Sequence, residues 1–187
     1  MELVAPDKAP DIKLVDSTGK PVEVGTGKRT LLAFFRDTNC PFCNMRIFQM
    51  TQRHKELSAA GLDVVAFFFS SQDDVQRFVR ARPRPFRVVA DPDNIAYQAY
   101  GIQKSFPKKI YGVFARLIMW IMGMKELGLE GTVRGLGGLN TNNILPADFL
   151  IDEKGYIVEV YYGQDPGDHI PFERIEQFVG INKKAGK

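Results

Sequence analysis

Cysteine is scarce in this chain of 187 residues, which holds only Cys40 and Cys43. Two cysteines three positions apart cannot build the disulfide framework of a small secreted scaffold. Histidine is equally scarce, and His54 and His169 are not at a metal-ligand spacing from each other. A structural zinc site needs about four ligands, so a zinc site is disfavoured. We expect neither a metal nor another bound cofactor.

Long apolar runs and a strong charge of one sign are also missing. No uninterrupted apolar stretch reaches the roughly 18 residues of a membrane span. The opening residues lack the basic start and apolar run of a secretory signal. The net charge of +3 gives no reason to expect a nucleic-acid partner. We therefore expect a cytoplasmic protein. In such a reducing compartment, a close cysteine pair is usually catalytic, redox-sensing or half of a metal site.

The remaining pattern alternates strands with helices. Short continuous apolar runs are typical of strands buried on both faces, and residues that alternate about a turn are typical of hairpins. The predicted strands span residues 11–16, 21–24, 30–35, 62–69, 86–90, 148–152 and 156–162. The predicted helices follow the cysteine motif up to Gly61, begin after Ser71, and cover 95–100 and 168–179. This order predicts a single α/β domain over residues 1–187 with a mixed central sheet and an N-terminal β-hairpin.

The segment from about 103 to 145 does not fit the minimal version of such a domain. It is too short for its own core, so we interpret it as a helical insertion. Residues 110–124 are apolar nearly all round a helix, and residues 104–145 hold six basic against two acidic side chains. Packing against its own domain, a homodimer contact, a membrane surface and an apolar substrate all stay open. We predict a protein contact, with a homodimer through 110–124 as the simplest form.

The pair Cys40 and Cys43 carries the chemistry that the sequence predicts. Cys40 stands where a buried strand gives way to a helix, and unpaired N–H groups and the helix dipole stabilise a thiolate there. The pKa of a thiol in such a place falls from about 8.5 to between roughly 3.5 and 7.5. We therefore predict Cys40 as the nucleophile and Cys43, one turn further, as the thiol that resolves a mixed disulfide. Two inert core cysteines are the competing interpretation.

Several segments resemble the alkyl hydroperoxide reductase and thiol-specific antioxidant family, a peroxiredoxin-like branch of the thioredoxin fold. The segments that carry the resemblance are residues 10–14, 31–35 leading into the cysteines, 90–93, 99–101 and 149–155. The resemblance implies a thioredoxin-like three-layer sandwich. It also implies a thiol-dependent oxidoreductase that reduces hydroperoxides or exchanges disulfides, and that a thioredoxin-like or glutathione-like donor resets.

The chain departs from that family at two positions. The Thr or Ser that typically lies three residues before the peroxidatic cysteine is Asp37 here, and the Arg before the strand at 149 is Pro146. Leu145 and Pro146 instead resemble the cis-proline loop of thioredoxin-like disulfide reductases, which faces the motif and binds substrate backbone. These departures favour disulfide exchange over peroxide reduction, and they predict a cis Leu145–Pro146 bond.

Further site residues follow from this resemblance. Thr38 and Arg46 are candidates to replace the missing family groups in part. The predicted substrate-binding residues are Thr38, Pro41, Phe42, Leu145 and Pro146. Asp37 either approaches Cys40 and raises its pKa or points into solvent. A non-catalytic thioredoxin-fold module that binds a partner through the insertion is the alternative function.

Overall fold

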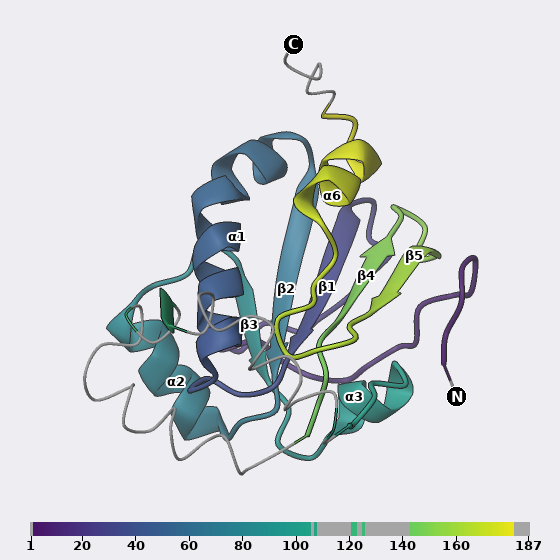
Figure 1. Ribbon diagram of the computed structural model, residues 1–187. Coiled ribbons are helices and arrows are strands. Elements are labelled where there is room, and N and C mark those ends of the chain that lie inside the picture. The colour runs from purple at the N-terminus through teal and green to yellow at the C-terminus, as the bar shows by residue number, and fades with distance from the viewer. Residues whose placement is uncertain (1, 106, 108–120, 123–124, 126–142, 182–187) are drawn as a thin grey trace.

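A mixed sheet of five strands forms the centre of the computed structural model, which describes residues 2–105, 107, 121–122, 125 and 143–181 (Figure 1). The strands are β1 (Arg29–Phe35), β2 (Leu62–Phe68), β3 (Arg87–Ala90), β4 (Ala147–Ile151) and β5 (Ile157–Tyr162). Their order is β3-β2-β1-β4-β5. The pairs β1–β2 and β2–β3 are parallel, whereas β1–β4 and β4–β5 are antiparallel. The predicted mixed sheet is confirmed.

Helices cover both faces of this sheet. They are α1 (Pro41–Ala59), α2 (Gln72–Ala81), α3 (Ile95–Ala99) and α6 (Phe172–Phe178). Core side chains of α1, α2 and α6 pack on one face, together with those of the segment before α6. Core side chains of α3 and the N-terminal segment pack on the other face. The result is the predicted three-layer sandwich of the thioredoxin type.

The middle strand β1 is packed on both faces up to its last residue. Phe34 lies opposite Phe67 in the neighbouring strand with ring centroids 4.7 Å apart, and Phe35 lies opposite Phe68 at 5.1 Å. Successive residues of a strand point to opposite faces, so the two stacked pairs anchor both layers. The chain therefore leaves β1 toward the cysteines from a rigid point.

The predicted N-terminal hairpin is reduced to one antiparallel bridge between Val15 and Pro21. One carboxylate oxygen of Asp16 accepts hydrogen bonds from the backbone of Thr18 and Lys20, which tightens the turn. Pro21 has no N–H to donate to a longer ladder. The turn forms where it was predicted, but the two flanking strands do not join the sheet.

The predicted closing helix begins later than residue 168. The Asp168 carboxylate accepts from the Tyr161 hydroxyl and from the backbone N–H of Gln164, and the helix starts only after Pro171. These two bonds, with the bond from the Ile170 N–H to Asp148, hold residues 168–170 outside the helix. The strand-and-turn pattern of the final hairpin, by contrast, is as predicted.

The two ends of the insertion lie side by side. Lys104 bridges to Ile144, and the backbone N–H of Ser105 donates to Asn143. Most of the helix predicted at 110–124 lies outside the described residues, so its homodimer contact stays a prediction. Ile121 and Met122 are described; both are helical, and they are 43% and 50% exposed. In the described part of the chain, no helix has the length and apolar character needed to cross a membrane.

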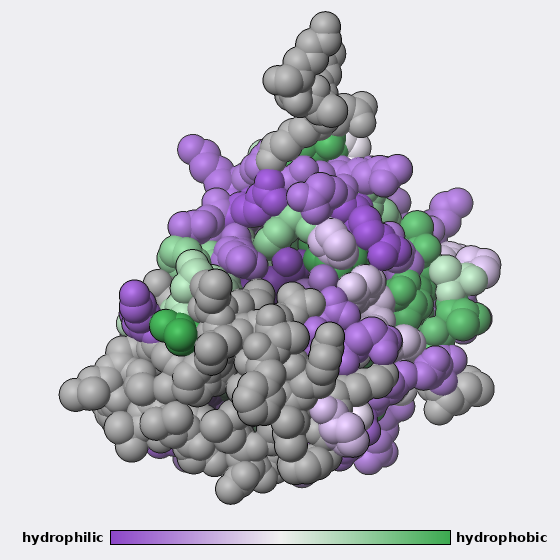
Figure 2. Space-filling view, in the orientation of Figure 1, coloured by the Kyte–Doolittle hydropathy of each residue, from purple (hydrophilic) through white to green (hydrophobic). Residues whose placement is uncertain are grey.

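The edge strand β5 leaves apolar side chains at the surface. Val158 on β5 and Val4 in the N-terminal segment are both at least half exposed. Figure 2 shows hydrophobic surface on the flank where these two segments lie, beside an otherwise largely hydrophilic face. This flank lies across β4 from the strand that leads to the cysteines.

Candidate active site

The cysteine motif occupies the junction between β1 and α1. Cys40 is the N-cap residue of α1, and Pro41 is at the first turn, where its missing N–H costs no hydrogen bond. The backbone N–H of Cys43 points at the Cys40 sulfur, with 3.5 Å between nitrogen and Sγ. The structure thus places the motif as the sequence predicts, with a helix end directed at one sulfur.

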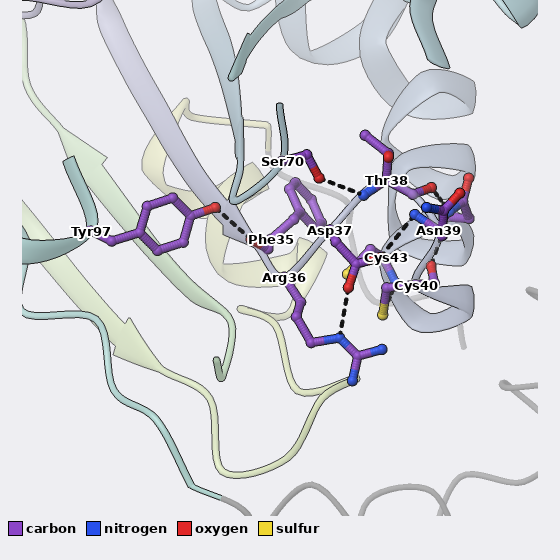
Figure 3. Close-up of polar contacts among 10 residues, drawn as sticks. Phe35, Arg36, Asp37, Thr38, Asn39, Cys40, Cys43, Ser70 and Tyr97 are labelled. Carbon is purple, nitrogen blue, oxygen red and sulfur yellow. Dashed lines mark hydrogen bonds and ion pairs between the residues drawn. The ribbon is translucent and has the colours of Figure 1, made fainter. Parts of the chain in front are cut away.

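The loop before the motif is held from two sides. The side-chain amide of Asn44 donates to the carbonyls of Thr38 (2.8 Å) and Cys40 (2.9 Å). The backbone N–H of Thr38 donates to the Ser70 hydroxyl beyond the end of β2 (Figure 3). At the end of β1, the Tyr97 hydroxyl donates to the Phe35 carbonyl. The geometry around Cys40 is therefore set before any ligand arrives.

The two thiols have opposite electrostatic environments. Burial raises the pKa of the Cys40 thiol, but a hydrogen bond from the Cys43 side chain and the Arg36 charge outweigh it, so the net pKa is lowered. Burial raises the pKa of Cys43, and the hydrogen bond to Cys40 and the Cys40 charge raise it further, to well above its usual range. Cys40 is therefore the thiol of the pair that ionises first, while Cys43 keeps its proton.

Arg36 and Asp37 form a buried ion pair next to Cys40. The Arg36 Nε donates to Asp37 Oδ2 at 3.1 Å, and both residues are buried. Burial opposes the charge on Arg36, but the Cys40 and Asp37 charges raise its pKa above the usual range. Asp37 does not point into solvent; it raises the Cys40 pKa, and Arg36 counteracts it.

The other residues predicted for substrate binding are buried. Thr38 is buried in the loop, and Phe42 is 1% exposed in the core beneath α1. Arg46 is held within the chain, although its Nε has no hydrogen-bond partner, and its substitution for the family arginine stays a prediction. Its guanidinium donates to the Ile170 carbonyl at 2.6 Å and lies over the Phe172 ring. Direct substrate contact by Thr38, Pro41 and Phe42 stays a prediction.

The predicted cis bond at Leu145–Pro146 is wrong. Among the described residues, the cis peptide bond is Ala5–Pro6, so the bond before Pro146 is trans. The Leu145 N–H donates to the Gln103 carbonyl at 3.0 Å, and the Pro146 carbonyl accepts from the Gly163 N–H at 2.9 Å. These bonds within the chain occupy backbone groups that a cis-proline loop offers to a substrate.

A buried polar cluster that the sequence did not reveal joins β4 to the segment before α6. The Asp148 carboxylate accepts from the Ile170 N–H at 2.8 Å and lies 2.9 Å from His169 Nδ1. The His169 ring packs on Phe35 at 4.8 Å between centroids. An aspartate in an otherwise apolar strand was the available signal for Asp148, and a basic residue at the end of a buried strand was the signal for Arg36.

A cavity of about 790 Å³ lies at the other end of the sheet from the cysteines. Its lining includes Arg29, Leu62 and Arg87, the first residues of the three parallel strands, whereas the motif follows the last residue of β1. This cavity therefore does not serve the cysteine chemistry. In the part of the chain that the structure describes, no cluster of three or more His, Cys, Asp or Glu side chains is suited to a metal.

Comparison with known proteins finds a family match over most of the chain. The family model of the AhpC/TSA family matches residues 5–160. Peroxiredoxin Bcp of Escherichia coli (strain K12) is 28% identical over 119 residues, which are 62% of this chain and 76% of that protein.

Two solved structures have the same fold. PrxQ of Xylella fastidiosa superimposes with a TM-score of 0.65 at 16% identity, covering 96% of this chain and 95% of that chain. A protein from Chlorobium tepidum named as a thiol:disulfide interchange protein, DsbE, gives a TM-score of 0.62 at 24% identity, over 95% and 96% of the two chains. At these identities the likeness shows the fold alone.

Proposed function

Because the chain belongs to the AhpC/TSA family and is a thiol-dependent oxidoreductase, we propose that it reduces hydroperoxides with Cys40 and Cys43. One observation carries the proposal. The two thiols of one helix start are shifted in opposite directions, Cys40 toward the thiolate and Cys43 toward the thiol. A nucleophile and a resolving partner need this difference.

The proposed cycle has three steps. The Cys40 thiolate attacks one oxygen of the hydroperoxide; an S–O bond forms, the O–O bond breaks, and the departing oxygen takes a proton to give an alcohol or water. Cys40 is now a sulfenic acid. The Cys43 sulfur attacks the Cys40 sulfur, the S–S bond forms, and hydroxide leaves with the Cys43 proton as water. An external thiol donor then reduces the disulfide to two thiols.

The surroundings of Cys40 support a small substrate over a protein disulfide. Cys40 is only 1% exposed, so a reacting group must reach a buried sulfur. The backbone at Leu145 and Pro146 is already hydrogen-bonded within the chain. A peptide substrate therefore lacks the backbone partner that a disulfide reductase provides. The preference for disulfide exchange that the sequence suggests is reversed for this reason.

The electron donor in this proposal is a thioredoxin-like dithiol or a glutathione-like thiol. The cycle returns the enzyme to the dithiol only where such donors are kept reduced, and we place it in the cytoplasm for that reason.

Stopped-flow mixing of the reduced protein with hydrogen peroxide, an organic hydroperoxide and a model disulfide tests the proposal. We expect Cys40→Ser to abolish the fast reaction with peroxides. Cys43→Ser should complete the first step and accumulate a sulfenic acid that a dimedone-type probe traps. Faster reaction with the disulfide than with either peroxide contradicts the proposal in favour of disulfide exchange, and inertness toward all three favours a non-catalytic binding module.

A further inference from the structure

We propose that Arg36 binds the hydroperoxide beside Cys40 and that Asp37 holds Arg36 in place for this task. The inference rests on the proposed function and names the residue that takes the place of the arginine the family carries where this chain has Pro146. Arg36 becomes a catalytic residue, because it contacts the reacting oxygens, and Asp37 becomes a positioning residue.

Arg36 has hydrogen-bond donors that no described residue uses. The residue is 3% exposed, and its Nε is bonded to Asp37. Within the described residues, no acceptor bonds to Nη1 or Nη2. Figure 3 shows the guanidinium on the side toward which the Cys40 sulfur points. The Nη atoms are not among the fully enclosed unpartnered atoms of the described residues. They are therefore within reach of a small molecule and can donate to its oxygen atoms.

Other arginines near the start of α1 are not available for this role. The Arg46 guanidinium is anchored away from this role by the Ile170 carbonyl and the Phe172 ring, with only its buried Nε unpartnered. Arg53, further along α1, pairs with Glu176 and also lies over the Phe172 ring. Arg36 is the cation whose charge reaches Cys40 and stabilises its thiolate.

The chemistry of the first step needs donors at this position. When the Cys40 sulfur bonds to the near oxygen, the electron pair of the O–O bond moves onto the departing oxygen. That oxygen carries negative charge until it takes a proton from water. Guanidinium N–H groups fixed beside it stabilise this charge and remain protonated throughout, which is electrostatic stabilisation of the transition state.

Asp37 opposes formation of the Cys40 thiolate but holds Arg36 in position. Its negative charge raises the Cys40 pKa. Its two oxygens have separate partners: Oδ1 accepts from the Asn39 N–H at 2.9 Å, and Oδ2 accepts from Arg36 Nε. The carboxylate thus ties Arg36 to the loop that carries Cys40 and leaves both Nη atoms free. Its presence at an electrostatic cost is explained by this positioning.

Two electrophiles separate binding of the peroxide from thiolate formation. Iodoacetamide needs only the thiolate, whereas hydrogen peroxide also needs donors for the departing oxygen. For wild type, Arg36→Met and Arg36→Lys, the rate of Cys40 with each reagent is measured against pH up to its plateau, where the thiolate is fully formed. We expect Arg36→Met to lower the plateau rate with peroxide by about 100-fold or more and to leave the plateau rate of alkylation unchanged. Arg36→Lys should recover part of the peroxide rate.

The variant Asp37→Asn gives a second test, because electrostatics and positioning predict opposite changes in its rate with peroxide. Loss of the charge lowers the pH at which Cys40 alkylates, so electrostatics alone predicts faster reaction with peroxide at neutral pH. Loss of positioning predicts a slower one, which is the result we expect. Asp73→Asn, an exposed aspartate on α2, is the matched control and should change neither rate.

Each outcome decides between the two proposals. Equal peroxide plateaus in wild type and Arg36→Met overturn the role of Arg36 and leave the proposed function standing. Faster peroxide reaction in Asp37→Asn overturns the role of Asp37. A wild-type protein whose peroxide rate is no higher than that of a free thiol overturns the proposed function itself. If Asp37→Asn does not fold, as circular dichroism reports, the two Arg36 variants still carry the test.

Discussion

At the scale of single residues, the asymmetry of the two thiols depends on the Cys43 side chain, the Arg36 charge and the Cys43 backbone N–H. The Cys43 side chain donates to the Cys40 thiolate, which lowers the pKa of Cys40 against the effect of burial. Because this folded-state pKa is depressed, ionisation of Cys40 stabilises the fold fully above its ordinary value of 9.0, and the contribution is lost as the pH falls through the folded pKa.

Two substitutions at position 43 test this bond. Cys43→Ala removes the donor and should move the pH midpoint of Cys40 alkylation upward, whereas Cys43→Ser keeps a donor and should leave the midpoint nearly in place. Iodoacetamide rates against pH under reducing conditions measure both midpoints. Equal midpoints in the two variants contradict the role of the Cys43 side chain and leave Arg36 and the helix end as the stabilising groups.

At the scale of elements, the first turn of α1 also fixes the loop that precedes it. Asn44 ties the turn to the Thr38 carbonyl, so the helix and the preceding loop form one unit. Asn44→Ala leaves that buried carbonyl without its amide donor and should lower the free energy of unfolding by about 1–3 kcal/mol. Urea denaturation measures the loss, and Gln52→Ala on the exposed side of α1 serves as control. An equal effect of both substitutions shows that Asn44 does not hold the loop.

At the scale of the whole molecule, Asp148 connects the layers. Its carboxylate joins β4 to His169 and to the Ile170 backbone, and Arg46 joins α1 to the Ile170 carbonyl. Asp148→Ala leaves His169 Nδ1 and the Ile170 N–H without their acceptor and should lower the free energy of unfolding by about 2–5 kcal/mol. Asp148→Asn should lower it less. Val158→Thr on the exposed side of β5 should stay within about 0.5 kcal/mol. Near-normal stability of Asp148→Ala means that the segment before α6 is held by apolar packing instead.

Local patterns in the sequence were sufficient for the order of strands and helices and for the position of the cysteine pair. Apolar runs identify β1 and β2 because a strand buried on both faces needs apolar residues throughout. Ser71 marks the start of α2 because its hydroxyl accepts the N–H of Asp74, three residues further along, a contact that involves neighbours in the chain alone. The placement of Cys40 at a helix start follows for the same reason.

The tertiary structure decided which polar groups meet. Arg46 and Ile170 are 124 positions apart, and Asp148 and His169 are 21 apart, so no local pattern pairs them. The same holds for Leu145 and Pro146, whose backbone groups bond to Gln103 and Gly163 rather than waiting for a substrate. Arg36 and Asp37 stand next to each other in the sequence, yet the burial of both follows from packing around the end of β1. A charge acquires its chemical role from the dielectric and the partners around it, and the fold alone supplies these.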